Sequence, residues 1–343
     1  MRIGLATNAA PEKEVRRADA VEALIRLVRD DMRAVDQIIH DRMTSPVGMI
    51  PNLAAYLIDS GGKRIRPMIT IAAARLFGGG GDAPRKLAAA VEFIHTATLL
   101  HDDVVDDSAL RRGRAPANRV WGNPASVLVG DFLFARSFNL MVEAGDLAVL
   151  DVLARASSII AEGEVMQLAA ANDADTSMKA YLQIVDAKTA ALFSAAARVG
   201  VMAAGKPGAP ADALAEYGRA LGLAFQLVDD ALDYGGRAAA MGKNVGDDFR
   251  EGKITMPVVF AREAGSDEEK AFWRRVMSAS QKQAEGDFEK ALTLLRERNA
   301  ITLTLDAARD YAQTAQKALA GAPDNDFKTA LYDLAEFVVD RAY

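Results

Sequence analysis

Helical periodicity is the feature that most restricts the fold of this chain. The stretch RADAVEALIRLVRDDMRAVDQIIHDRM, residues 17–43, repeats apolar side chains at three- and four-residue spacing, which is typical of an amphipathic helix packed on a core. Alanine, leucine, glutamate, lysine and arginine fill the other long stretches, and no convincing period-two alternation indicates a β-strand. The sequence therefore predicts an all-α fold.

Short breaks rich in glycine, proline or small polar residues separate the helical stretches. They lie at SPVGMIP (45–51), FGGGGDAP (77–84), GNP (122–124), AANDADTS (170–177), AGKPGAP (204–210) and GAPDND (321–326). Between them we expect roughly ten or more helices, several of them long enough to cross a domain of this size. No low-complexity linker divides the chain, so we predict one all-α domain over residues 1–343, a bundle with antiparallel neighbours.

Composition excludes several classes of function. The formal net charge of −6 lacks the excess basicity of a general nucleic-acid-binding protein, so we expect no nucleic-acid partner. The absence of cysteine excludes disulfides, thiolate metal sites and a cysteine nucleophile, and it agrees with a reducing cytoplasm. The most apolar window, residues 189–205, is short for a membrane span and contains Arg198, so we expect a buried helix in a soluble, cytoplasmic protein.

Two acidic motifs share one spacing. LLHDDVVDD (99–107) is matched by FQLVDDALDY (225–234), and both place Asp-Asp-x-x-Asp after an apolar run. Helix positions i, i+1 and i+4 cluster on one face, so each motif presents a patch of carboxylate oxygens that suits Mg²⁺. Most acidic runs are solvated helix faces, but the apolar context and the repetition favour two facing patches that hold a diphosphate through bridging metal ions.

Basic residues accompany both acidic motifs. SGGKRIRP (60–67) places three cations between a Gly-Gly turn and a proline, where lysine and arginine suit a phosphate, although a basic loop alone is more often simply solvated. Other candidates lie near the aspartates or in an otherwise apolar helix: His95, Arg111, Arg112, Lys188, Lys243 and Lys253. Together they indicate a site for phosphate groups.

Six stretches resemble the trans-isoprenyl diphosphate synthase, or polyprenyl synthetase, family. They are GGKRIRP, FIHTATLLHDDVVDDSALRRG, AEGEVMQL, AKTAALF, GLAFQLVDDALDY and GKNVGDDFREGKITMP, in family order across residues 61–257. The resemblance is strongest to bacterial octaprenyl, solanesyl and decaprenyl diphosphate synthases, and it implies the isoprenoid synthase fold around a central cavity. The C-terminal helices of residues 265–343 carry no recognisable chemical signal.

The resemblance implies a role for each motif residue. The diphosphate of isopentenyl diphosphate would be bound by Lys63, Arg66, His95 and Arg112. Mg²⁺, three ions per active site with diphosphate bound, would be held by Asp102, Asp103, Asp106, Asp229 and Asp233, and Asp230 completes the second motif. The allylic diphosphate would be surrounded by Arg111, Lys188, Thr189, Gln226, Lys243 and Lys253.

The implied reaction is a head-to-tail condensation of isopentenyl diphosphate onto an allylic diphosphate. It needs no protein nucleophile, but it needs stabilisation of the charge on the leaving diphosphate. The aspartates, with Lys188 and Lys243, are therefore the expected catalytic residues. The resemblance also implies a homodimer and transient membrane association during product release.

Product length is approached through the helix that carries the first motif. Ala97 and Thr98 lie about one turn before Asp102, and both are small where short-chain relatives have a bulky aromatic residue. We therefore expect a medium- or long-chain product of about eight to ten isoprene units, for a quinone side chain. The alternatives are a shorter, geranylgeranyl-type synthase, a regulatory subunit, and more remotely a class I terpene cyclase.

Overall fold

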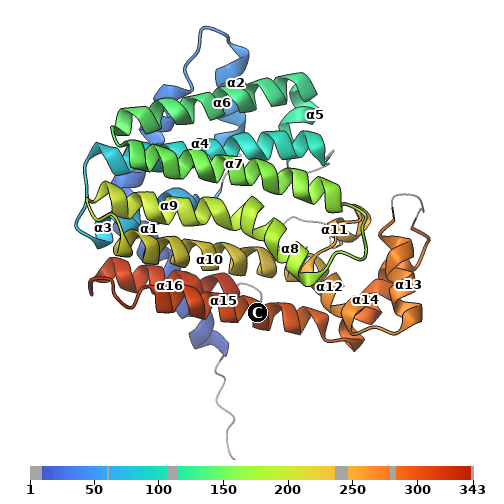
Figure 1. Ribbon diagram of the computed structural model, residues 1–343. Helices are drawn as coiled ribbons and strands as arrows, with labels where there is room; N and C mark the ends of the chain where they lie inside the picture. Colours follow the sequence, from blue (N-terminus) through green and yellow to red (C-terminus); the bar gives the residue numbers. More distant parts are fainter. Residues whose placement is uncertain (1–9, 60–61, 107–113, 236–245, 279–282, 341–343) are drawn as a thin grey trace, which may run out of the picture.

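The computed structural model describes residues 10–59, 62–106, 114–235, 246–278 and 283–340 (Figure 1). Within these ranges there is no β-strand, so the predicted all-α fold is confirmed. The long helices are α1 (Ala10–Arg42), α3 (Ile65–Leu76), α4 (Asp82–Val105), α6 (Asn123–Ala144), α7 (Leu147–Ala170), α9 (Ala191–Ala203), α10 (Ala209–Tyr234), α15 (Ala300–Ala318) and α16 (Asp326–Asp340).

Shorter helices fill the connections between the long ones. They are α2 (Met49–Asp59), α5 (Ala117–Trp121), α8 (Met178–Val185), α11 (Asp247–Arg250), α12 (Met256–Glu263), α13 (Asp267–Val276) and α14 (Asp287–Glu297). A single π-helical segment, η1 (Asp186–Ala190), joins α8 to α9. Among them, α8, α11 and α12 pack against α10, which carries the second acidic motif.

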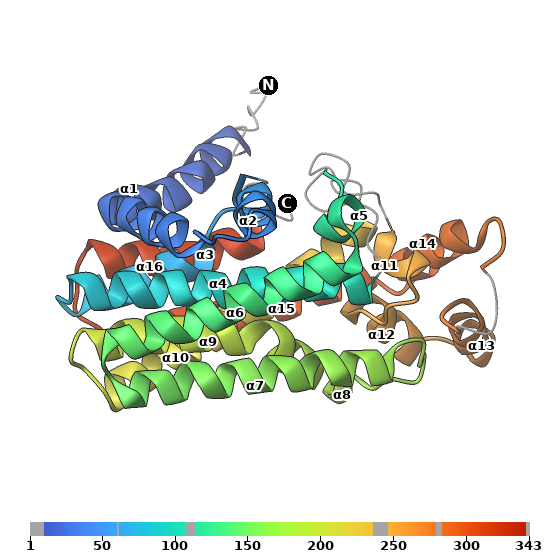
Figure 2. The same ribbon diagram turned by 90° about the horizontal axis from the view of Figure 1, so that it is seen from above.

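The long helices pack side by side around a shared apolar core. The most extensive contacts join α4 to α6, α10 to α15, and α9 to both α3 and α10. A second, smaller core lies among α11–α14 and includes the fully buried Trp273. Figure 2 shows α13 and α14 at one end of the long bundle. The single-domain organisation stays a prediction.

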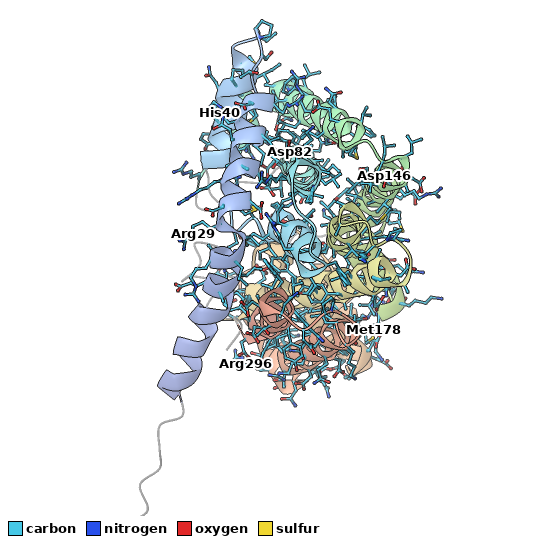
Figure 3. The ribbon with its side chains drawn as sticks, turned by 90° about the vertical axis from the view of Figure 1, so that its left-hand side faces the viewer. Arg29, His40, Asp82, Asp146, Met178 and Arg296 are labelled. Atoms are coloured by element: carbon cyan, nitrogen blue, oxygen red, sulfur yellow. The ribbon has the colours of Figure 1, made fainter. Side chains whose placement is uncertain are left out.

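Helix α1 confirms the amphipathic helix expected at residues 17–43. Four apolar side chains at helical spacing are almost completely buried, namely Leu24, Val28, Val35 and Ile39. The helix packs against α3, α4 and α16 along one side of the bundle, and its N-terminal turns extend beyond the other helices (Figure 3).

A buried carboxylate ties α1 to two other helices. Asp31 accepts hydrogen bonds from Arg75 Nε of α3 at 2.8 Å and from Arg85 Nε of α4 at 2.9 Å. Burial raises the pKa of the Asp31 carboxyl, but the two guanidinium groups outweigh burial and hold that pKa below its usual value.

The apolar stretch at 189–205 lies mostly in α9, whose side chains are largely buried, as expected. It is not, however, the most membrane-like part of the chain. Among the described residues, α6 is long and apolar enough to cross a membrane by length and composition, and 39% of its apolar window is buried.

Candidate active site

The first acidic motif lies at the C-terminal end of α4. Asp102 and Asp106 are one turn apart and half-buried, and Asp106 caps the helix through its N–H bond to the Asp102 carbonyl at 2.8 Å. Asp103 is about 100° further around the helix and is only 1% exposed. The i and i+4 carboxylates therefore share a partly accessible face, as the spacing predicts.

Lys188 brings positive charge to this face. Its Nζ lies 2.6 Å from Glu164 Oε2 of α7 and 3.6 Å from Asp102 Oδ2. Burial, together with the nearby Asp102 charge, raises the pKa of Glu164 above its usual value. Glu164 was not among the predicted site residues, although it lies inside the stretch AEGEVMQL that carries the family resemblance.

The π-helical segment η1 carries Lys188 between two glycines. A Cβ on Gly163 of α7 would lie 2.7 Å from the Lys188 backbone nitrogen, and a Cβ on Gly222 of α10 would lie 2.7 Å from Ala190 Cα. Only residues without a side chain allow this approach. Because π-helical turns occur mostly as local insertions at functional sites, the close packing on both sides is consistent with a positioned lysine.

The second acidic motif lies at the C-terminal end of α10. Asp230 is 2% exposed and accepts hydrogen bonds from the Tyr181 hydroxyl, from Gln226 Nε2 at 2.9 Å and from the Met256 N–H at 3.2 Å. Burial raises the pKa of Asp230 to about 6, against the lowering effect of these hydrogen bonds. Asp230 therefore anchors α10 to α8 and α12.

The other two aspartates of the motif have different surroundings. Asp229 is half-buried, whereas Asp233 is 5% exposed and its Oδ2 accepts the Asp248 N–H at 3.1 Å. On the same helix, Gln226 Oε1 accepts the Thr189 hydroxyl at 3.1 Å, which links α10 to η1 beside Lys188.

Lys253 joins the two acidic motifs. Its Nζ lies 2.9 Å from Asp106 Oδ2 and 2.8 Å from Glu251 Oε2, and its N–H donates to the Asp248 carbonyl at 2.9 Å. Burial lowers the pKa of Lys253, but the neighbouring carboxylates outweigh burial and hold it above the usual value. Since Asp248 also contacts Asp233, the segment 246–253 brings the ends of α4 and α10 together.

The donor chemistry of these two helix ends fits a hard divalent cation. In the described part of the chain no three Asp, Glu or His side chains are grouped closely enough to hold a metal ion by themselves. Mg²⁺ retains several waters and is bound by one or two carboxylates together with substrate phosphates. The half-buried Asp102, Asp106 and Asp229 suit a cation that arrives with a diphosphate.

A basic site lies at the start of α3. Arg66 Nη1 is 3.3 Å from His95 Nε2 of α4, and its guanidinium lies 4.2 Å from the Phe193 ring centroid of α9. Lys63 Nζ lies 5.2 Å from the ring centroid of Phe337 of α16. Phe337 was missed because residues 265–343 show no chemical motif, and only the fold brings that helix to the basic site.

Three of the predicted site residues lie outside the described residues, namely Arg111, Arg112 and Lys243. Ala97 is completely buried in the core, while Thr98 is half-buried and its hydroxyl donates to the His95 carbonyl at 2.8 Å. Their role in setting product length stays a prediction.

Comparison with known proteins relates nearly the whole chain to one family. A polyprenyl synthetase family model matches residues 48–295. Octaprenyl diphosphate synthase of Haemophilus influenzae is 43% identical over 324 residues, covering 94% of this chain and 98% of that protein. A crystal structure of polyprenyl synthase from Caulobacter crescentus, complexed with calcium and isoprenyl diphosphate, is 54% identical with a TM-score of 0.89, covering 94% and 98% of the two chains. Decaprenyl diphosphate synthase from Rhodobacter capsulatus is 52% identical with a TM-score of 0.90, covering 94% and 99%.

Proposed function

This chain belongs to the polyprenyl synthetase family and is a prenyltransferase, and from that premise we propose a Mg²⁺-dependent synthesis of a medium- or long-chain all-trans polyprenyl diphosphate. The observation that carries the proposal is that Lys188 and Lys253 both contact the α4 aspartates, while segment 246–253 joins these to Asp233 of α10. Carboxylates can bind the metal ion and lysines can bind the diphosphate, so a partly buried site that has both suits a metal-bound diphosphate.

The residues of the chain divide between two diphosphates. Lys63, Arg66 and His95 hold isopentenyl diphosphate, while Lys188, Lys253 and Gln226 surround the allylic diphosphate. When bound, Mg²⁺ on the aspartates, three ions in our proposal, supplies further positive charge to the leaving group. Fixed lysines in a site that excludes most water stabilise the diphosphate as the allylic C–O bond ionises. The isopentenyl double bond then attacks the allylic cation, and the new cation loses a proton to the released diphosphate to form the product double bond.

Lys188 and Lys253 also contact the first acidic motif. Each is within 4 Å of an aspartate of the first motif. A bound diphosphate would draw the ammonium groups toward itself and leave Asp102 and Asp106 to the cation. The Caulobacter protein, crystallised with calcium and isoprenyl diphosphate, supports this pairing of a divalent cation with a prenyl diphosphate.

A product of about eight to ten isoprene units is supported by relatives named octaprenyl and decaprenyl diphosphate synthase. The small side chains Ala97 and Thr98, one turn before the first motif, support the same length. A product of this length would serve a quinone side chain. A geranylgeranyl-type product is the outcome that would replace this part of the proposal.

We also propose a cytoplasmic homodimer that contacts a membrane only while releasing its apolar product. The hairpin of α6 and α7 supports an interface between two copies, because it exposes large apolar side chains that a soluble chain would cover. They are Val127, Leu128, Val142, Leu147, Ile159, Val165 and Leu168.

Incubation with labelled isopentenyl diphosphate, an allylic primer and Mg²⁺ tests the proposal directly. Chromatography of the dephosphorylated products measures chain length, and an identical reaction in excess EDTA is the control. We expect a long-chain ladder that disappears with the chelator. Condensation that continues in EDTA would contradict the metal requirement, and a ladder that stops at four units would contradict the long product.

A further inference from the structure

The residue between Lys63 and α3 has an unusual backbone. Arg64 has φ 46° and ψ 41°, in the left-handed region that L-amino acids with large side chains seldom occupy. Within the described residues, the other non-glycine residues with positive φ are Asn172 and Asn299, and asparagine tolerates this conformation. Strained backbone of this kind clusters at functional sites, and Arg64 lies beside the proposed binding residue Lys63.

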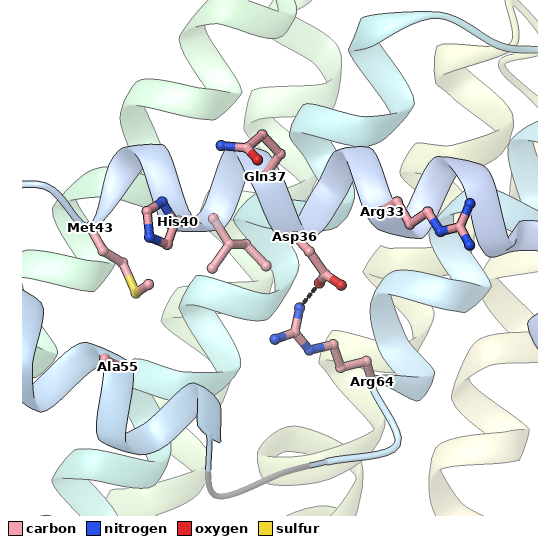
Figure 4. Close-up of a pocket in the computed structure, with 8 residues that line it drawn as sticks. Arg33, Asp36, Gln37, His40, Met43, Ala55 and Arg64 are labelled. Carbon is pink, nitrogen blue, oxygen red and sulfur yellow. Dashed lines mark hydrogen bonds and ion pairs between the residues drawn. The ribbon is translucent and has the colours of Figure 1, made fainter.

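An ion pair holds the Arg64 side chain. Its Nη1 contacts Asp36 Oδ1 of α1 (Figure 4), and its side chain is 19% exposed, against 56% for Asp36. Asp36 lies beside the buried Val35, so it projects from a firmly docked part of α1. The Arg64 carbonyl meanwhile accepts the Met68 N–H at 3.1 Å and begins α3.

The Arg64 side chain also borders open space. It lines a pocket of about 420 Å³ whose other residues lie on α1 and at Met43 just after it, with Ala55 of α2 (Figure 4). Space beside the guanidinium leaves room for other rotamers, and the ion pair with Asp36 favours the one that is observed.

We propose that the ion pair between Asp36 and Arg64 positions the binding loop for isopentenyl diphosphate. Arg64 lies between Lys63 and Arg66, so its φ and ψ set the direction of Lys63 relative to Arg66 and His95. Asp36 and Arg64 are positioning residues in this account, and neither needs to touch the substrate. The inference rests on the proposed function, in which these cations bind isopentenyl diphosphate.

Asp36→Asn removes the tether and keeps the size of the side chain. We expect KM for isopentenyl diphosphate to rise about three- to tenfold, as one partly exposed ion pair and one left-handed residue allow. The kcat and the KM for the allylic primer should stay close to the wild-type values. Asp30→Asn is the matched control, because Asp30 is an exposed aspartate of the same helix whose ion pair is with Arg33 rather than with Arg64.

Two substitutions of Arg64 separate positioning from direct binding. Glycine takes φ 46° without strain, whereas alanine does not, so Arg64→Gly should raise KM less than Arg64→Ala. If the Arg64 guanidinium bound the diphosphate itself, both variants would lose that contact and KM would rise equally in both. The exchanged pair Asp36→Arg with Arg64→Asp should recover part of the affinity that Arg64→Asp alone loses.

Calorimetric titration with isopentenyl diphosphate gives the same comparison without turnover. A higher Kd for Asp36→Asn than for Asp30→Asn, with equal melting temperatures, would support the inference. An unchanged Kd for Asp36→Asn would overturn the inference. A lower Kd would overturn it too, because it would mean that the released arginine binds the substrate itself. A wild-type protein that binds isopentenyl diphosphate but condenses none would contradict the proposed function instead.

Discussion

The middle aspartate of each acidic motif is more deeply buried than the aspartate directly before it. Asp103 and Asp230 are 1% and 2% exposed, whereas Asp102, Asp106 and Asp229 keep access to solvent. Position i+1 is about 100° around the helix from position i, so it points toward the packed side when the i and i+4 pair faces the site. Asp230 uses this position to accept bonds from Tyr181 and Met256, beside Asp229, which we propose binds Mg²⁺.

Asp102→Asn tests the binding role at the scale of one residue. The amide keeps the size of the side chain but removes a negative charge that the proposed Mg²⁺ requires. We expect kcat for condensation to fall by at least about a hundredfold, as loss of one electrostatic contact to a transition state allows. The matched control is Asp151→Asn on α7, where an exposed carboxylate pairs with Arg155 of its own helix. Unchanged activity of Asp102→Asn would remove Asp102 from the site.

Ala97→Phe tests the control of product length at the same scale. Ala97 is completely buried, and a close-packed wall does not yield readily to a ring. If the growing chain extends past this residue, long products should disappear while short ones and the Mg²⁺ requirement remain. The product ladder of the variant is compared with wild type and with Ala97→Ser, which adds little volume. Identical ladders would mean that Ala97 does not face the growing chain.

At the scale of elements, the site depends on how closely three helices approach each other. Helices α7 and α10 contact η1 through Gly163 and Gly222, so Lys188 is held between two backbones. Segment 246–253 then closes the space between α4 and α10 through Lys253. Each acidic motif is local, but the lysines that make it a site come from other elements.

Gly163→Ala is expected to disturb this arrangement. The added Cβ would lie 2.7 Å from the Lys188 nitrogen, and overpacking of this kind costs about 1–3 kcal/mol. That cost exceeds the roughly 1 kcal/mol that alanine gains over glycine in a helix. Urea unfolding should show net destabilisation, and kcat should fall as Lys188 shifts. Gly321→Ala is the control, because nothing lies within 4 Å of its added Cβ. Stabilisation of Gly163→Ala would show that the helices separate without strain.

At the scale of the whole molecule, α1 is held to the bundle by apolar burial and by one buried carboxylate. Asp31 bonds to Arg75 and Arg85, which come from α3 and α4, the helices that carry Arg66 and the first acidic motif. The same helix supplies Asp36 to the binding loop. Docking of α1 therefore supports both the fold and the proposed basic site.

The Asp31 carboxyl gives this docking a dependence on pH. Its folded pKa lies below the ordinary value of 3.8, so its ion pairs stabilise the fold above that value and are lost as pH falls through the folded pKa. Asp31→Asn should lower the free energy of unfolding by about 1–3 kcal/mol at pH 7, as loss of charged hydrogen bonds does. The difference from wild type, measured by urea unfolding at several pH values, should shrink below pH 3.8. A difference that does not change with pH would mean that the charge of Asp31 is not what stabilises the fold.

The sequence by itself determined the helical class and the shared carboxylate face of the first acidic motif. Both depend on periodicities within single helices, where neighbours three or four residues apart are fixed by the geometry of one turn. The buried stripe of α1 and the shared face of Asp102 and Asp106 were predictable for that reason. The family resemblance, rather than any local spacing, assigned Lys188 and Lys253 to the site for the allylic diphosphate.

Only the tertiary structure decided which distant residues complete the site. Glu164 meets Lys188, Phe337 meets Lys63, and Asp36 meets Arg64 across separations that no local spacing encodes. These contacts depend on how helices pack, and packing depends on the combined shape of many side chains rather than on one motif. The left-handed backbone of Arg64 is of the same kind, because the local sequence disfavours it and the ion pair that we propose holds it comes from another helix.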